Sequence, residues 1–252
     1  MIQVNQLSKC YQGKKVVDGA QAQFERGKVT AIIGPNGAGK STLLAMAARL
    51  TSRDSGNVII DGKEIAQWNT GQLAKRLAVL RQANSFAMRF TVQELVAFGR
   101  FPYSKGRLTD RDNQVIHSAL AYLDLVELKD KYLDELSGGQ RQMAFIAMVL
   151  AQDTDYVYLD EPLNNLDIKH SLQIMQVIQK MAHEMQKAVV IVIHDINFAS
   201  CYCDTILALK HGKVVASGAV DEVIQGPVLS SIYETPFEIL TVKGKRICSY
   251  MV

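Results

Sequence analysis

A glycine-rich segment carries the first clear chemistry in this sequence. The candidate loop and the residue after it are Gly34, Pro35, Asn36, Gly37, Ala38, Gly39, Lys40, Ser41 and Thr42. Glycines at this spacing let backbone N–H groups point inward at phosphate oxygens, and a following helix adds its N-terminal dipole. Lys40 would then reach the β- and γ-phosphates, and Ser41 would coordinate Mg²⁺. A glycine-rich turn that matches by chance is the alternative, but the apolar run before the loop and the helix-like run after it favour nucleotide binding.

Two neighbouring carboxylates follow a second apolar run. Residues 156–159 read as a buried strand that ends directly before Asp160 and Glu161. The carboxyl ends of strands are where α/β sheets place their ligands. We expect Asp160 to hold Mg²⁺ through water and Glu161 to polarise an attacking water, which indicates hydrolysis. A solvated strand end is the alternative.

A third segment, Leu136-Ser137-Gly138-Gly139-Gln140, precedes a strongly helical pattern. A serine and two glycines at a helix start present hydroxyl and N–H donors, so this segment also predicts an anion site. We call residues 136–140 the signature segment. A chain with one phosphate loop does not obviously need a second cradle for the same nucleotide.

The elements that must position these residues alternate along the chain. Residues 29–33, 156–159 and 188–193 are apolar or nearly so, which favours strands buried on both faces of a mostly parallel sheet. Asp61-Gly62, between two short β-branched segments, predicts a tight hairpin and an antiparallel β element. Between residues 87 and 151 the strand pattern gives way to helical periodicity. There, Thr91 and Glu94 have the spacing of a capping box.

Composition excludes several protein classes. The 252 residues are 48% hydrophobic and 21% charged. These proportions are typical of globular proteins and exclude a disordered or coiled-coil chain. Lys and Arg (28) nearly balance Asp and Glu (25) without basic runs, so nucleic acid is not an expected partner. The cysteines, Cys10, Cys201, Cys203 and Cys248, form no spaced framework, which favours a reducing cytosol. The start of the chain has no export pattern, and no apolar run approaches the roughly 18 residues of a membrane span.

The phosphate loop, the signature segment and Asp160-Glu161, in this order, resemble the nucleotide-binding subunit of an ABC (ATP-binding cassette) transporter. The resemblance covers nearly the whole chain. It implies a P-loop NTPase core of the RecA type, with a mainly parallel sheet, an antiparallel β subdomain and an inserted helical subdomain. We expect a single ABC ATPase domain, 1–252, made of a core with β subdomain (1–86 and 152–225), a helical signature subdomain (87–151) and a C-terminal tail (226–252).

The resemblance also assigns roles to single residues. It implies that Tyr11 stacks on adenine, although an aromatic ring that only packs at a strand end is the alternative. It implies that Gln82 senses the γ-phosphate and that His194 contacts it, against the alternative of a structural histidine. In all, it implies ATP binding by Tyr11, by residues Gly34 to Thr42, and by Gln82, Ser137, Gly138, Gly139, Gln140 and Asp160; catalysis by Lys40, Glu161 and His194; and Mg²⁺ binding by Ser41, Gln82 and Asp160.

One pair departs from the commonest family pattern. Asn164-Asn165 stands where many members carry Ser-Ala, in the loop that crosses the dimer interface, while Leu166 and Asp167 keep the pattern. We still expect the dimer interface to form and ATP to be hydrolysed. The departure concerns the detailed hydrogen bonding between the two ATP sites of the dimer.

The resemblance implies partners and a place in the cell. In that family each ATP lies between the phosphate loop of one subunit and the signature segment of the other, so two copies pair head to tail. Membrane permease subunits and, indirectly, a substrate-binding protein complete the importer. We expect a peripheral protein on the cytoplasmic face of the inner membrane. Phe98, Phe101 and Tyr103 either form the permease dock or close the core of the helical lobe.

The cargo is indicated by two local likenesses. Residues 90–103 are similar to the equivalent stretch of importers for ferric siderophores, haem and cobalamin, and residues 161–168 are similar to iron-siderophore members. We therefore expect ferric siderophore uptake. Haem, cobalamin or metal-ion import is the alternative, followed by a soluble ABC ATPase without a permease. A nucleotide-binding protein that does not hydrolyse is disfavoured because Glu161 and His194 are both present.

Overall fold

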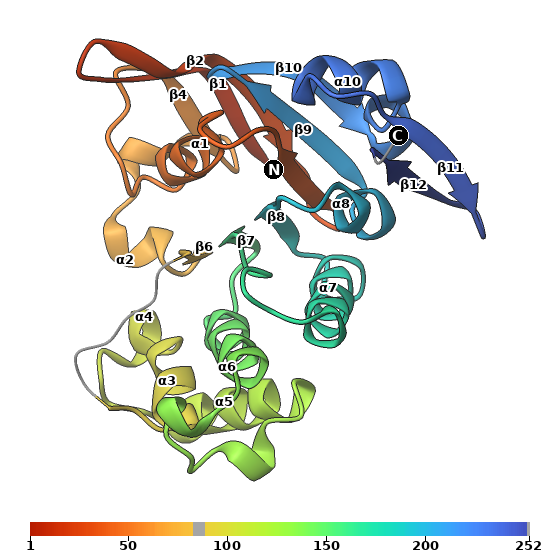
Figure 1. Cartoon of the computed structure of the whole chain (residues 1–252). Coiled ribbons are helices and arrows are strands. Elements are labelled where there is room, and N and C mark those ends of the chain that lie inside the picture. Colours follow the sequence, from red (N-terminus) through yellow and green to blue (C-terminus); the bar gives the residue numbers. More distant parts are fainter. Residues whose placement is uncertain (83–88, 251–252) are drawn as a thin grey trace. The chain divides into compact units, whose positions relative to one another are not determined.

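The computed structural model describes residues 1–82 and 89–250. By their internal contacts these residues form two compact units, one of Met1–Trp68 with Ile178–Val252 and one of Asn69–Val177 (Figure 1). Among the helices formed by these residues, none combines the length and the apolar character needed to cross a bilayer.

The first unit contains a four-stranded antiparallel sheet in the order β2-β1-β4-β5. Its strands are β1 Ile2–Tyr11, β2 Lys14–Phe24, β4 Ser55–Ile60 and β5 Lys63–Glu64, and the 3-10 turn η1 Ile65–Gln67 follows. Asp61 and Gly62 both have positive φ, 50° and 80°, and join β4 to β5. The predicted hairpin is therefore confirmed, since a two-residue turn of this type needs left-handed backbone at both positions.

The second sheet of this unit carries the phosphate loop. Its strands β8 Ala188–Val192, β3 Val29–Ile33, β9 Thr205–Lys210 and β10 Lys213–Ala219 lie in the order β10-β9-β3-β8. β3 runs parallel to both β8 and β9, and every residue of β3 and β8 is buried. The predicted parallel pairing is confirmed here. Helices α1 Lys40–Ala47 and α8 Ile196–Tyr202 follow β3 and β8.

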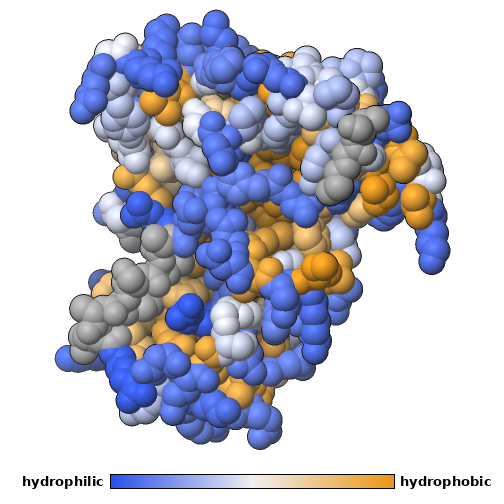
Figure 2. Space-filling model, in the orientation of Figure 1, coloured by the Kyte–Doolittle hydropathy of each residue, from blue (hydrophilic) through white to orange (hydrophobic). Residues whose placement is uncertain are grey.

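The C-terminal part of the first unit is a small layer of its own. Two helices, α9 Val220–Val223 and α10 Gly226–Tyr233, precede the hairpin of β11 Glu238–Val242 and β12 Lys245–Ser249. β12 packs on α8 through Ser200, whose hydroxyl donates to the Arg246 carbonyl at 2.6 Å. Apolar side chains gather at the surface beside this hairpin (Figure 2), and Leu240 and Val242 are exposed there. All four cysteines lie among the described residues and are free thiols.

The second unit holds the parallel pair β6 Leu77–Leu80 and β7 Tyr156–Asp160 together with a group of helices. These helices are α2 Thr70–Leu73, α3 Val92–Phe98, α4 Phe101–Ser104, α5 Asp110–Tyr122, α6 Gly138–Ala151 and the start of α7 Ile168–His183, with 3-10 turns η2 Val126–Leu128 and η3 Leu133–Glu135. α3, α5 and α6 pack on one another. The predicted capping box is confirmed, because the Thr91 hydroxyl accepts from the Glu94 N–H while the Glu94 carboxylate accepts from the Thr91 N–H.

A buried ion pair fixes the second unit internally. The side chains of Arg100 and Asp112 are both 5% exposed, and Arg100 Nε donates to Asp112 Oδ1 at 2.9 Å. Arg100 also donates to the Ala151 carbonyl at 2.9 Å, which ties the start of α4 to the end of α6. The predicted boundary between residues 86 and 87 lies outside the described residues, as do the last two residues of the predicted tail.

Candidate functional site

The phosphate loop lies between β3 and α1, as predicted. Gly34 has a φ of 141°, and a Cβ there would lie 2.0 Å from the Leu209 carbonyl oxygen. Gly39 has a φ of 100°, and a Cβ there would lie 2.4 Å from the Val16 carbonyl oxygen. Backbone angles and space both restrict these two positions to glycine, which keeps the loop tightly wound beneath the start of α1.

Lys40 is held inside this loop. Its side chain is buried, and Nζ donates to the carbonyls of Gly34 and Pro35 at 2.8 and 3.0 Å. The N-cap of α1 is Gly39, which provides no side-chain cap. The N–H groups at the start of a helix, together with a neighbouring ammonium group, form a suitable environment for phosphate oxygens.

Tyr11 and His194 belong to the same unit as the loop. Tyr11 is the last residue of β1; its ring is exposed, and Lys9 Nζ lies 5.4 Å from the ring centroid. His194 follows β8 by two residues and is exposed. The next residue, Asp195, caps α8 by accepting from the Asn197 and Phe198 N–H groups at 2.8 and 3.1 Å. An exposed ring and an exposed imidazole are available for contact with a nucleotide.

The acid pair ends β7 in the second unit. Asp160 is the last residue of the strand, and Glu161 follows with a φ of 52°. Gln82 Nε2 donates to Glu161 Oε2 at 2.5 Å, and the Asn164 side-chain amide donates to the same oxygen. The fold therefore brings together Gln82 and Glu161, which are 79 residues apart in the chain.

The signature segment starts α6. Ser137 is the N-cap: its hydroxyl accepts from the Gln140 N–H at 3.2 Å, and Gln140 returns a bond to the Ser137 N–H at 3.1 Å. A Cβ on Gly139 would lie 2.2 Å from the ring of His170, so that ring occupies the space beside the glycine. At the start of α6, Ser137 and Gly138 are exposed, whereas Gly139 is buried.

Asp167 orients the His170 ring. Its Oδ1 accepts from the His170 backbone N–H at 2.8 Å and lies 2.7 Å from His170 Nδ1. These bonds, the backbone one first, hold the pKa of Asp167 below its usual value.

Sequence reasoning missed three contacts of the candidate site. These are the bond from Asn164 to Glu161, the packing of His170 on Gly139, and a bond from the Gly34 N–H to the Tyr233 hydroxyl. The departure at Asn164 from the family pattern was the one sequence signal that pointed to any of them.

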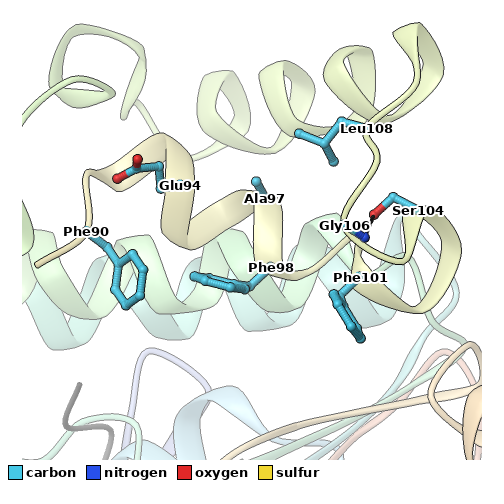
Figure 3. A pocket seen from close by; sticks show the side chains of 8 residues that line it. All are labelled: Phe90, Glu94, Ala97, Phe98, Phe101, Ser104, Gly106 and Leu108. Carbon is cyan, nitrogen blue, oxygen red and sulfur yellow. Dashed lines mark hydrogen bonds between the residues drawn. The ribbon is translucent and has the colours of Figure 1, made fainter. Parts of the chain in front are cut away.

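An apolar groove lies on the surface of the second unit. It has a volume of about 340 Å³ and is lined by Phe90, Glu94, Ala97, Phe98, Phe101, Ser104, Gly106 and Leu108. The rings of Phe90 and Phe98 pack edge to face with centroids 5.1 Å apart, and Figure 3 shows them on the same side as Phe101. Phe101 is 59% exposed, whereas Tyr103 packs under Arg100, whose guanidinium lies 4.0 Å from the ring centroid. Two of the three predicted docking residues therefore face solvent and the third packs within the unit.

Comparisons with known proteins agree with these features. The sequence model described as ABC transporter matches residues 17–164. The chain is 52% identical over 250 residues to the petrobactin import ATP-binding protein YclP of Bacillus subtilis (strain 168), covering 99% of each. It is 47% identical over 240 residues to the petrobactin import ATP-binding protein FatE of Bacillus anthracis, covering 95% of this chain and 96% of that protein. The dimeric structure of MJ0796, a bacterial ABC transporter cassette, matches with a TM-score of 0.77 and 28% identity, covering 87% of this chain and 99% of the other. These matches confirm the predicted fold class.

Proposed function

The chain belongs to the ABC transporter family as an ATP-binding cassette ATPase, and on that premise we propose that it drives the uptake of a ferric siderophore. The observation that carries the proposal is the likeness to petrobactin import subunits along almost the whole chain. Haem, cobalamin and metal-ion import are the competing cargoes, because a cassette does not touch the transported molecule.

The geometry of the phosphate loop supports nucleotide binding by the first unit. The glycine-restricted turn leads directly into the start of α1, where backbone N–H groups would suit phosphate oxygens. Lys40 would exchange its two loop carbonyls for the β- and γ-phosphates, since a charged phosphate oxygen is the stronger acceptor. The exposed ring of Tyr11 offers a face on which adenine can stack.

Mg²⁺ fits the chemistry of three polar residues of the chain. Ser41, Gln82 and Asp160 carry the hydroxyl, amide and carboxylate oxygens that this ion prefers. Because the amide nitrogen of Gln82 donates to Glu161, its amide oxygen is the atom that would face a cation. Bound Mg²⁺ supplies charge neutralisation on the phosphate oxygens.

Hydrolysis is assigned to Glu161 with His194. The carboxylate of Glu161 orients a water for in-line attack on the γ-phosphate and accepts its proton. Gln82, the residue expected to sense the γ-phosphate, donates to the same side chain. The bond therefore couples that sensing to the base. His194 adds a polar contact to the γ-phosphate as negative charge shifts during transfer.

The second anion site is assigned to the ATP held by another copy of the chain. Ser137 and Gly138 lie exposed at the start of α6, where the Ser137 hydroxyl and the Gly138 N–H group can face the phosphates bound by a partner loop, with the buried Gly139 directly behind them. A head-to-tail pair with this geometry is two-fold symmetric, so both sites close together. ATP binding would close the pair and hydrolysis would open it.

The groove around Phe98 and Phe101 is assigned to a permease subunit. An exposed, largely apolar groove with one carboxylate, Glu94, suits an amphipathic helix from a membrane partner. Such docking would hold the chain peripherally on the cytoplasmic face of the inner membrane, with a substrate-binding protein delivering cargo on the other side. We propose the predicted core, helical signature subdomain and tail (1–86 with 152–225, 87–151 and 226–252) as the divisions of this single ATPase domain.

The test is iron uptake in cells that lack this protein. Wild type should restore uptake of iron carried by petrobactin or another siderophore, and Glu161→Gln should not. Purified Glu161→Gln should bind ATP, accumulate as a closed dimer and turn over at least about 10²-fold more slowly, because an amide cannot accept the proton.

Each outcome separates one part of the proposal from another. Rapid hydrolysis by Glu161→Gln would reject the base. The protein could instead restore the uptake of haem or cobalamin while the uptake of siderophore-bound iron does not require it. That result would reject the siderophore as cargo and leave the ATPase assignment intact.

A further inference from the structure

The turn after β7 contains a side chain that the mechanism above does not use. The backbone N–H of Asn164 donates to the Glu161 carbonyl at 3.3 Å, which closes a tight turn over residues 161–164. Glu161 has a left-handed backbone, with a φ of 52°. A glutamate in this region is strained and persists where neighbouring contacts hold it. The turn therefore directs the Glu161 and Asn164 side chains toward each other.

Two amides hold one oxygen of the Glu161 carboxylate. The side-chain N–H groups of Gln82 and Asn164 both donate to Oε2, Gln82 at 2.5 Å. A carboxylate oxygen accepts through two lone pairs, so two donors occupy Oε2. These two bonds fix the orientation of the Glu161 carboxylate relative to the turn and to Gln82.

We propose that Asn164 is a positioning residue for hydrolysis: by donating to Oε2 it holds the Glu161 carboxylate in the orientation from which that side chain acts on the attacking water. The inference rests on the proposed role of Glu161 as the base. Many members of the family carry serine where this chain has Asn164. A serine hydroxyl is shorter than an asparagine amide and has one donor instead of two, so the hold on Oε2 is strongest with asparagine.

The experiment compares three substitutions in the full chain: Asn164→Ser, Asn164→Ala and Asn164→Asp. Steady-state ATP hydrolysis with Mg²⁺ gives kcat and KM for each. Asn164→Ala should lower kcat at least about tenfold, as expected for a lost hydrogen bond to a charged group, with KM within about twofold of wild type. Asn164→Ser should lose less than alanine, because the hydroxyl can still donate.

Aspartate distinguishes hydrogen bonding from space filling. It has nearly the shape of asparagine, but its carboxylate cannot donate and repels Glu161. Asn164→Asp should therefore be slower than Asn164→Ala. If Asn164→Asp keeps the wild-type kcat, the side chain only fills space and the proposal is overturned.

A second background locates the effect at Glu161. In Glu161→Gln, adding Asn164→Ala should cause no further loss of the residual single-turnover rate, because the carboxylate to be positioned is gone. An equal fold loss in both backgrounds would place the action of Asn164 elsewhere and overturn the proposal.

The rates of Glu161→Gln and Asn164→Ala distinguish a wrong base from a wrong positioning residue. If Glu161→Gln hydrolyses ATP at the wild-type rate, the base itself is wrong. If Glu161→Gln is slow while Asn164→Ala matches wild type, only the positioning role falls. Melting temperatures of the three single variants show whether each is folded, and the order of rates among folded variants remains decisive.

Discussion

The hydroxyl oxygen of Tyr233 accepts a hydrogen bond from the backbone N–H of Gly34 at 3.0 Å. Gly34 opens the phosphate loop, and Tyr233 is the last residue of α10, 199 positions later in the chain. Burial raises the pKa of Tyr233 to about 12, so the phenol stays protonated and neutral at physiological pH. The C-terminal layer thus contributes directly to the shape of the loop.

Replacing Tyr233 with phenylalanine tests this contact. Tyr233→Phe removes the acceptor and leaves the Gly34 N–H unsatisfied, which should cost about 1–3 kcal/mol of unfolding free energy. Weaker ATP binding should accompany the loss, because the first residue of the loop is less fixed. Denaturant unfolding and an ATP titration measure both effects. Tyr250→Phe, which changes an exposed tyrosine of the same C-terminal layer, is the matched control and should behave as wild type. Equal stability of Tyr233→Phe and wild type would contradict the prediction.

Gly139 and His170 predict a steric rescue. Gly139→Ala would place a methyl group 2.2 Å from the His170 ring, so we expect a loss of about 1–3 kcal/mol in stability, with reduced ATP hydrolysis. The double variant Gly139→Ala/His170→Ala should recover the melting temperature, since the ring is removed. Gly138→Ala is the control for stability alone, because its Cβ would meet only Leu166 Cδ2 at 3.9 Å. A stable Gly139→Ala single variant would show that the ring moves aside freely.

The buried pair Arg100–Asp112 predicts a large stability effect. Arg100→Met leaves the Asp112 carboxylate buried without its cation, which should cost about 3–5 kcal/mol in chemical denaturation. Arg100→Met/Asp112→Met removes both charges and should recover part of that loss. If the single and the double variants are equally unstable, packing rather than charge is responsible.

The same pair predicts a pH dependence. The N–H and hydroxyl of Thr109, followed by Arg100, lower the pKa of Asp112 to about 2 from an ordinary value of 3.8. A lowered pKa means that the folded state binds this proton less tightly than the unfolded state. The contribution, about 2 kcal/mol, is therefore complete above pH 3.8 and is lost as the pH falls toward 2. Unfolding measured across that range should show a smaller slope in Asp112→Asn than in wild type, and an unchanged slope would contradict the assignment.

The apolar groove predicts a loss of coupling to the permease. Phe101→Asp places a charge in the groove, so it should reduce both co-purification with the membrane partner and siderophore-dependent iron uptake, without changing the melting temperature. Leu50→Asp, which alters an equally exposed apolar residue of the first unit, is the control and should support uptake. Normal uptake with Phe101→Asp would remove the groove from the docking surface.

The sequence by itself determined the parts of this protein whose geometry depends on near neighbours. The glycine spacing of the phosphate loop, the hairpin at Asp61-Gly62 and the capping box at Thr91 involve residues a few positions apart, and turns and helices fix such distances. Continuous apolar runs likewise predicted the buried strands β3 and β8.

Only the tertiary structure decided the contacts that complete the candidate site. Gln82 meets Glu161 because β6 and β7 pair in parallel. Tyr233 meets Gly34 because α10 packs against β9 of the same unit. Asn164 is only three residues from Glu161, yet its bond depends on the left-handed backbone at Glu161. The residue types in this turn do not predict that backbone conformation, because glutamate seldom adopts it. Spacing along a chain specifies local geometry, whereas strand pairing and the direction of a strained turn are set by packing throughout the unit.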